Sequence, residues 1–234
     1  MDYSDYQKAI FAFTEGHGAC IAVAGSGKTT TGVEFCNRID SMFDVAFMAF
    51  NTKIRDELRE RLPTVDCRTY NGFGWGIVLN NMTTKPKLNK GKTASIFFNL
   101  VQDKPSWCGP IVRLVSLFKN LAFFDVDTAM SKYPGIIEHY GIDTPDDRTF
   151  ITCLAQVYRL SLNMESIMDF DDQKFMPLYK GMNIPQYDIL CIDEYQDTCP
   201  IEAMLLENKT GRSMVFGDPD QCIYSFKGTT PDAF

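Results

Sequence analysis

The fold is decided by the stretch CIAVAGSGKTT, which occupies residues 20–30. Its first residues are small and apolar, as in a buried strand of a parallel sheet, and a glycine turn and a helix-forming segment follow. The spacing Ala22-x-x-x-x-Gly27-Lys28-Thr29 fits a phosphate-binding loop if alanine is accepted for the first glycine. The alternative is an ordinary glycine-rich turn with an exposed lysine. The order strand, loop and helix favours the phosphate-binding interpretation.

The residue types of this loop are suited to bind a nucleoside triphosphate. Gly25 and Gly27 let successive N–H groups point at one anion, and the N-terminus of the next helix adds partial positive charge. Lys28 is expected to reach the β- and γ-phosphates, and the Thr29 hydroxyl to ligate Mg²⁺. We therefore expect ATP and Mg²⁺ as cofactors. The other loop residues assigned to ATP are Ala24, Ser26 and Thr30.

Composition limits the classes of function. The chain has 234 residues, of which 45% are hydrophobic, so it is long enough to bury a sizeable core. A net charge of −7 argues against coating nucleic acid by bulk attraction, so any DNA contact must be focused. Eight scattered cysteines and two histidines do not predict a zinc site or a disulfide framework. Residues 1–15 lack a basic leader and no run suits a membrane span, so we expect a cytoplasmic protein without a membrane partner.

A short helix precedes the loop. Ser4 and Gln7 have the spacing of a capping box, in which each side chain satisfies the other residue's backbone donor. Alternatively, the Gln7 amide lies close enough in sequence to the loop to contact the adenine edge as donor and acceptor. The sequence alone leaves both roles open.

The segments after the loop predict a parallel α/β sheet with an insertion. The apolar run at 45–50 and the alternating segment at 65–70 read as strands, the second broken at Asn71-Gly72, and helices are expected at about 29–38 and 53–62. From 76 to 180 the strong segments are helical, at 93–101, 110–121 and 145–162, the last with Thr144 as its N-cap. Four lysines at 85–92 predict a solvated loop, with nucleic-acid phosphate contact as the alternative.

Strand signals return near the end of the sequence. The run at 188–192 delivers Asp193 and Glu194 at its carboxyl end, where the first acid would hold Mg²⁺ and the second would activate the attacking water. The alternative is an acidic helix start. A last strand at 214–216 leads to Gln221, which is placed to sense the γ-phosphate, although the preceding Asp218-Pro219-Asp220 is also a good turn.

Together these segments resemble the Q-motif and motifs I, Ia, Ib, II and III of superfamily 1 DNA helicases of the UvrD/Rep type. The resemblance rests on Gln7 and on the segments AGSGKT at 24–29, TYNGFG at 69–74, DEYQD at 193–197 and GDPDQCIYSFKG at 217–228, with the Phe50 segment between the first two. The residues at 169–172, DFDD, also resemble a stretch near the end of the family's helical insertion.

The resemblance implies a fold and a set of roles. The fold is a P-loop NTPase (RecA-like) parallel sheet with helices on both faces, formed by residues 1–75 and 181–234, with an inserted, mostly α-helical subdomain at 76–180. Gln7 would contact adenine, Glu194 would be the catalytic base beside Lys28, and Gln221 would couple the γ-phosphate to motif III. The residues that match the path of single-stranded DNA are Phe50, Asn51, Thr69, Tyr70, Asn71, Tyr224 and Phe226. For the aromatic ones the alternative is core packing.

Some residues depart from the family pattern. Asn71 stands in place of a histidine, Asn51-Thr52 reverses the usual order, and Thr30 replaces an arginine. The sequence printed here also ends just after motif III, without the family's second RecA-like domain and its arginines. We therefore expect the N-terminal motor half of an ATP-dependent 3′–5′ DNA helicase or translocase, a poorly active ATP hydrolase by itself, acting on single-stranded or partly duplex DNA in repair or replication in a bacterium or a virus-infected cell. The alternatives are a naturally short ATP- or single-stranded-DNA-binding regulator and another P-loop phosphotransferase.

Overall fold

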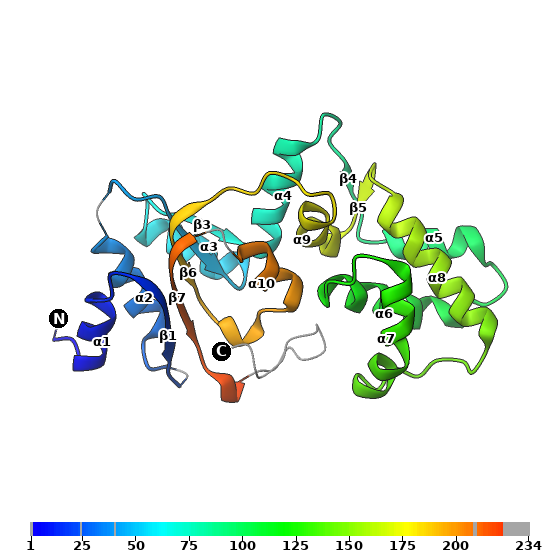
Figure 1. The fold of residues 1–234 in the computed structure, drawn as a ribbon, viewed down its shortest axis with the longest axis horizontal. Helices are drawn as coiled ribbons and strands as arrows, with labels where there is room; N and C mark the ends of the chain where they lie inside the picture. Colours follow the sequence, from blue (N-terminus) through cyan, green and yellow to red (C-terminus); the bar gives the residue numbers. More distant parts are fainter. Residues whose placement is uncertain (1, 24, 40, 208–209, 222–234) are drawn as a thin grey trace. The chain divides into compact units, whose positions relative to one another are not determined.

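The computed structural model describes residues 2–23, 25–39, 41–207 and 210–221. These residues form two compact units (Figure 1). The first unit contains the described residues of 2–73 and 184–221, and the second is Gly74–Asn183. The chain therefore leaves the first unit, builds the second, and returns.

The first unit is an α/β sheet of five parallel strands in the order β1-β7-β6-β2-β3. Its strands are β1 (Gly16–Ile21), β2 (Val45–Ala49), β3 (Asp66–Thr69), β6 (Tyr187–Ile192) and β7 (Thr210–Gly217). Its helices are α1 (Asp5–Phe11), α2 (Lys28–Asn37), α3 (Thr52–Arg61) and α10 (Pro200–Leu206), with short 3-10 turns η2 (Tyr195–Asp197) and η3 (Pro219–Gln221). The predicted parallel α/β class is confirmed.

Helices cover both faces of this sheet. Side chains alternate between the faces along a strand, so Phe47 and Cys191 point to one face and Met48 and Ile192 to the other. The first face packs on α2 and α3 in one buried cluster, which includes Phe47 and Leu58. On the second face, Leu190 and Ile192 line a cavity of about 390 Å³ with residues of α10. In Figure 1, α1 and α2 accordingly lie on the opposite side of β1 and β7 from α10.

All five strands are parallel, so their carboxyl ends lie along one edge of the sheet. The phosphate loop after β1, Asp193 after β6 and Asp218 after β7 therefore meet at that edge, although long stretches of sequence separate them.

Two sequence expectations for this unit need correction. The strand before the loop begins at Gly16 and is an outermost strand of the sheet. Its residues are therefore exposed or half-buried rather than buried. The Asn71-Gly72 pair does not end β3, because the strand already ends at Thr69 and helix α4 (Tyr70–Asn81) begins at Tyr70 and runs through the pair. Because glycine is a poor helix former, the glycine-rich start concealed this helix in the sequence.

The second unit is mostly helical. After the start of α4 it contains α5 (Lys92–Leu100), η1 (Pro105–Trp107), α6 (Cys108–Asn120), α7 (Val126–His139), α8 (Arg148–Asn163) and α9 (Phe170–Tyr179). A two-stranded parallel sheet of β4 (Lys87–Leu88) and β5 (Ile167–Met168) completes it. The helix predicted at 145–162 forms, but its N-cap is Asp147 instead of Thr144, because the Asp147 carboxylate accepts the Thr149 N–H at 2.7 Å.

A buried ionic cluster lies inside this unit. The Lys92 ammonium is 2.7 Å from Asp172 Oδ2, and the Lys119 ammonium is 2.8 Å from Asp172 Oδ1 and 2.9 Å from Asp169 Oδ2. Burial lowers the pKa of Lys92. Burial also acts on Lys119, but Asp169 and Asp172 outweigh it and raise the pKa of Lys119. Lys92 is therefore not part of a solvated loop, as the lysine run predicted, but a core residue with 1% of its surface exposed.

Candidate functional site

The loop between β1 and α2 has the backbone of an anion-binding turn. Gly25 and Gly27 have φ angles of +72° and +87°, the left-handed region that favours glycine. Gly27 is also the N-cap of α2 and contributes no side-chain hydrogen bond to its first turn. The first backbone N–H groups of α2 therefore receive no hydrogen bond from the side chain of the N-cap residue, and they remain available to a phosphate. Ser26 and Thr30 are exposed on the same segment, and Ala24 lies outside the described residues.

Lys28 is folded back onto this loop. Its side chain is buried, with 8% of the residue exposed, and its ammonium donates to the Ala22 carbonyl at 2.9 Å and to the Val23 carbonyl at 3.5 Å. An ammonium held this way keeps its charge close to the loop glycines. Exchanging a carbonyl for a phosphate oxygen would satisfy the same donors with an anion.

Thr29 and Asp193 meet at the carboxyl ends of the strands. The Thr29 hydroxyl donates to Asp193 Oδ2 at 2.7 Å. Asp193 is 2% exposed, and this burial raises the pKa of its carboxyl group. Both side chains offer the oxygen ligands that Mg²⁺ prefers, and Mg²⁺ typically takes only one or two protein ligands besides water and phosphate. The pair therefore fits Mg²⁺, while the described residues contain no cluster of three or more acidic, histidine or cysteine ligands.

Glu194 adopts a strained backbone conformation next to this pair. Its φ of +52° lies in the left-handed region, which costs a residue with a Cβ about 1–2 kcal/mol. The half-buried carboxylate accepts a hydrogen bond from Gln196 Nε2 at 2.7 Å. Gln196 Oε1 in turn accepts the Asp218 N–H at 3.0 Å, and Gln221 Nε2 donates to the Asp218 carboxylate. The two residues predicted to act on the γ-phosphate are thus joined through two others.

The sequence predicts no role for Gln196 and only a turn for Asp218. Nothing in their spacing indicates that the ends of two strands bring these residues together. The signal was only their polarity: each follows a buried strand closely, and polar residues there meet at one sheet edge.

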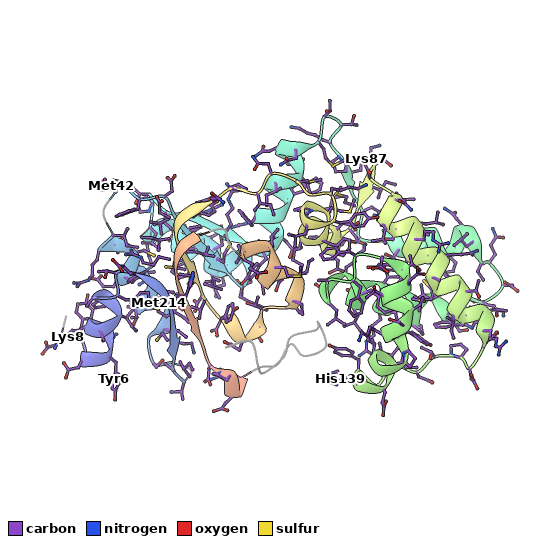
Figure 2. All side chains as sticks on the ribbon, viewed as in Figure 1. Tyr6, Lys8, Met42, Lys87, His139 and Met214 are labelled. Carbon is purple, nitrogen blue, oxygen red and sulfur yellow. The ribbon has the colours of Figure 1, made fainter. Side chains whose placement is uncertain are left out.

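Gln7 lies beside the loop as predicted from its position. The capping box with Ser4 forms, since Gln7 Oε1 accepts the Ser4 N–H at 3.0 Å and Ser4 Oγ accepts the Gln7 N–H at 3.3 Å. Gln7 Nε2 also donates to Thr31 Oγ1 on α2 at 3.0 Å. These bonds fix the amide at the wall of a cavity of about 680 Å³, which is also lined by Tyr6, Ser26 and Lys28. Figure 2 shows the Tyr6 side chain projecting from α1, in agreement with its 87% exposure.

The residues predicted to line a DNA path are placed differently from one another. Thr69 and Tyr70 are buried, and the Tyr70 hydroxyl lies 3.0 Å from Thr198 Oγ1. Burial raises the pKa of Tyr70, and this environment favours core packing over base stacking for its ring. Asn51 is exposed, but its side chain caps α3 by accepting the Ile54 N–H at 2.9 Å. Phe50 and Asn71 are half-buried, and Tyr224 and Phe226 lie outside the described residues.

Comparison with known proteins places this arrangement in a family. The family model described as an AAA domain matches residues 6–227. The chain belongs to this AAA domain family. A nucleotide-binding site is what such a P-loop domain implies, in agreement with the geometry of the loop and of Lys28.

Curated relatives of the family match most of the chain at low identity. F-box DNA helicase 1 of Gallus gallus is 24% identical over 89% of this chain, and F-box DNA helicase protein 1 of Schizosaccharomyces pombe is 24% identical over 91%. ATP-dependent DNA helicase Rep of Escherichia coli is 24% identical over 92%. The resemblance to UvrD/Rep-type helicases is therefore confirmed as distant homology.

The chain spans only part of these relatives, between 22% and 36% of their own length. Among the described residues, no helix is both long and apolar enough to cross a membrane.

Proposed function

We propose that this chain is the N-terminal ATP-binding motor part of a 3′–5′ DNA helicase or translocase. The observation that carries the proposal is the meeting of Lys28, Thr29, Asp193 and Glu194 at one sheet edge in a domain homologous to ATP-dependent helicases. The first unit is then the first RecA-like domain, and the second unit is the inserted helical subdomain. The polarity and the association with DNA rest on the family resemblance, and the cytoplasmic location rests on the composition of the sequence.

Each residue has a defined part in the proposed site. Lys28 neutralises the β- and γ-phosphates, Thr29 and Asp193 hold Mg²⁺, and Glu194 accepts the proton of the attacking water. Bound Mg²⁺ supplies charge neutralisation on the phosphate oxygens. Arginines from a second RecA-like domain of a longer protein would add on the order of 10³- to 10⁵-fold in rate, so this chain by itself should hydrolyse ATP slowly.

The DNA partner is proposed as single-stranded or partly duplex DNA, bound without sequence preference. Stacking of bases on aromatic side chains is worth about 1–3 kcal/mol per base, and it does not discriminate between bases. Because the net charge is −7, binding must depend on a local surface and not on bulk attraction.

The test is Mg-ATP binding and hydrolysis by the purified chain, with and without single-stranded DNA. Lys28→Ala should abolish binding, whereas Lys132→Ala, which removes an exposed lysine of the second unit, should leave it unchanged. Glu194→Gln should keep binding and lose on the order of 10²- to 10⁴-fold in hydrolysis. Binding that is insensitive to Lys28→Ala would contradict the proposal. Fast DNA-stimulated turnover would instead indicate a short, self-sufficient ATPase.

A further inference from the structure

A series of hydrogen bonds joins Glu194 to Gln221 through the Gln196 amide and through both the backbone N–H and the carboxylate of Asp218. Gln196 Nε2 donates to Glu194 Oε2 at 2.7 Å, and Gln196 Oε1 accepts the Asp218 N–H at 3.0 Å. Gln221 Nε2 donates to the carboxylate of Asp218. The connection therefore runs from the end of β6 to the turn after β7 without a break.

The two residues in the middle of this hydrogen-bond series are buried, and the two residues at its ends are not. Gln196 and Asp218 are 3% and 4% exposed, whereas Glu194 is half-buried and Gln221 is exposed. A buried amide is costly to displace, because each polar atom that loses its partner retains its desolvation penalty. Glu194 and Gln221 are consequently accessible to a ligand, while the buried residues between them fix their relative positions.

Two contacts of the Gln196 amide, with Glu194 and with Asp218, determine its orientation. A carboxylate accepts hydrogen bonds and a backbone N–H donates one, so the NH₂ group must face Glu194 and the oxygen must face Asp218. A flipped amide would place oxygen against the carboxylate and NH₂ against the N–H, and both contacts would be repulsive. The geometry therefore allows one orientation only.

We propose that Gln196 is a positioning residue that fixes the Glu194 carboxylate and, through Asp218, ties its position to that of Gln221. The inference rests on the proposed role of Glu194 as the catalytic base. A residue that only braced the fold would stabilise the turn without affecting how the carboxylate acts. Here the donor group of Gln196 binds the reactive carboxylate itself, at the one position in this turn with a left-handed backbone.

The first experiment separates binding from turnover. Single-turnover ATP hydrolysis, with the chain in excess over nucleotide, should fall about 10- to 100-fold in Gln196→Met, because a misplaced catalytic group costs on this order. The dissociation constant for Mg-ATP should stay within about threefold. The matched control is Gln173→Met, which removes a buried glutamine of the second unit and should leave turnover unchanged.

A double-variant comparison distinguishes positioning from a structural role. In a Glu194→Gln background the carboxylate is already absent, so Gln196→Met should cause no further loss of turnover. An equal loss in both backgrounds would overturn the inference. Wild-type turnover in Gln196→Met would overturn it as well, whereas Mg-ATP binding that survives Lys28→Ala would instead reject the proposed function.

A second variant covers the case in which Gln196→Met does not fold. Gln196→Glu keeps an acceptor for the Asp218 N–H but places a carboxylate against Glu194. Two carboxylates so close repel each other and displace the Glu194 carboxylate, so single-turnover hydrolysis should fall about 10- to 100-fold while Mg-ATP binding is kept. Wild-type turnover in Gln196→Glu would contradict the inference.

Nuclear magnetic resonance of the Gln196 side-chain amide gives a readout that does not depend on turnover. Its two N–H signals should shift in Glu194→Gln, which removes the charge from their acceptor, and in Gln221→Ala, which releases the Asp218 carboxylate. Signals that respond to neither variant would show that the chain of contacts does not couple the two sites.

Discussion

The hydroxyl of Thr29 donates to Oδ2 of Asp193 at 2.7 Å, although the two residues are 164 positions apart in the sequence. The contact joins the first turn of α2 to the end of β6. It also leaves a carboxylate in a site where only 2% of the residue is exposed. Burial of this carboxylate therefore costs folding free energy in the free chain, and the proposed Mg²⁺ would compensate its charge.

Asp193→Asn should stabilise the free chain and weaken its Mg²⁺-dependent binding of ATP. Burial raises the pKa of the Asp193 carboxyl group above its ordinary 3.8. As pH rises above 3.8, the unfolded chain loses this proton more readily than the folded chain, so the free energy of unfolding falls. The full loss is present at neutral pH. The variant should therefore gain stability at pH 7, seen as a higher Tm than that of the unchanged chain. Urea unfolding at pH 4 and pH 7 measures this gain, which should shrink at the lower pH.

The same variant should lose at least about tenfold in ATP affinity in the presence of Mg²⁺, because an amide oxygen is a weaker ligand than a carboxylate. Asp103→Asn, which changes an exposed acid of the second unit, is the control for both measurements. A less stable variant with unchanged Mg²⁺-dependent binding would contradict the assignment.

Gly74→Ala should destabilise the chain severely. A Cβ built at Gly74 lies 2.0 Å from the carbonyl oxygen of Gln173, which is backbone and cannot turn aside. Overpacking of this kind costs about 1–3 kcal/mol and sometimes more. Gly135→Ala in α7 is the control, since a Cβ there meets no atom within 4 Å and should raise helix stability slightly. Equal melting temperatures for the two variants would show that α4 and α9 do not approach this closely.

Lys119→Met should destabilise the chain by about 3–5 kcal/mol, because it removes the cation from the buried Asp169 and leaves Asp172 paired with Lys92 only. Lys119 is 1% exposed and lies within 2.9 Å of both Asp169 and Asp172. Lys85→Met removes an exposed lysine and should have little effect. Urea unfolding compares the two, and a loss below about 1 kcal/mol for Lys119→Met would mean that the remaining lysine compensates.

Much of the first unit could be predicted because its signals are local. A few neighbouring residues are enough to recognise each of these features: the glycines of the loop, the apolar runs of β2 and β6, and the acids after β6. The contact of Gln196 with Asp218 could not be predicted this way, because Asp218 follows β7, a strand that comes later in the sequence. For the same reason, the lysine run concealed that Lys92 is buried: its acid is 80 positions away.

Tyr70→Phe should lower stability by about 1 kcal/mol and leave single-stranded DNA binding unchanged. The hydroxyl that it removes lies 3.0 Å from Thr198 Oγ1 in a buried setting, and a buried hydrogen bond typically contributes about that amount. Thr198→Val removes the other partner, and the two changes should be non-additive. Fluorescence anisotropy with labelled oligothymidine measures binding. A large loss of DNA affinity without a change in stability would instead assign the Tyr70 hydroxyl to the DNA path.

Tyr6→Ala should weaken ATP binding without changing the affinity for inorganic tripolyphosphate. Tyr6 is 87% exposed and lines the same cavity as Gln7 and Lys28, so its ring is available to a base, while the phosphates depend on the loop. Losing one stacking contact costs about 1–3 kcal/mol, which is a fall of roughly 5- to 150-fold in affinity. Tyr6→Phe keeps the ring and should restore ATP binding, and isothermal titration measures all three chains with both ligands. Equal losses for ATP and tripolyphosphate would mean that Tyr6 supports the loop and does not contact the base.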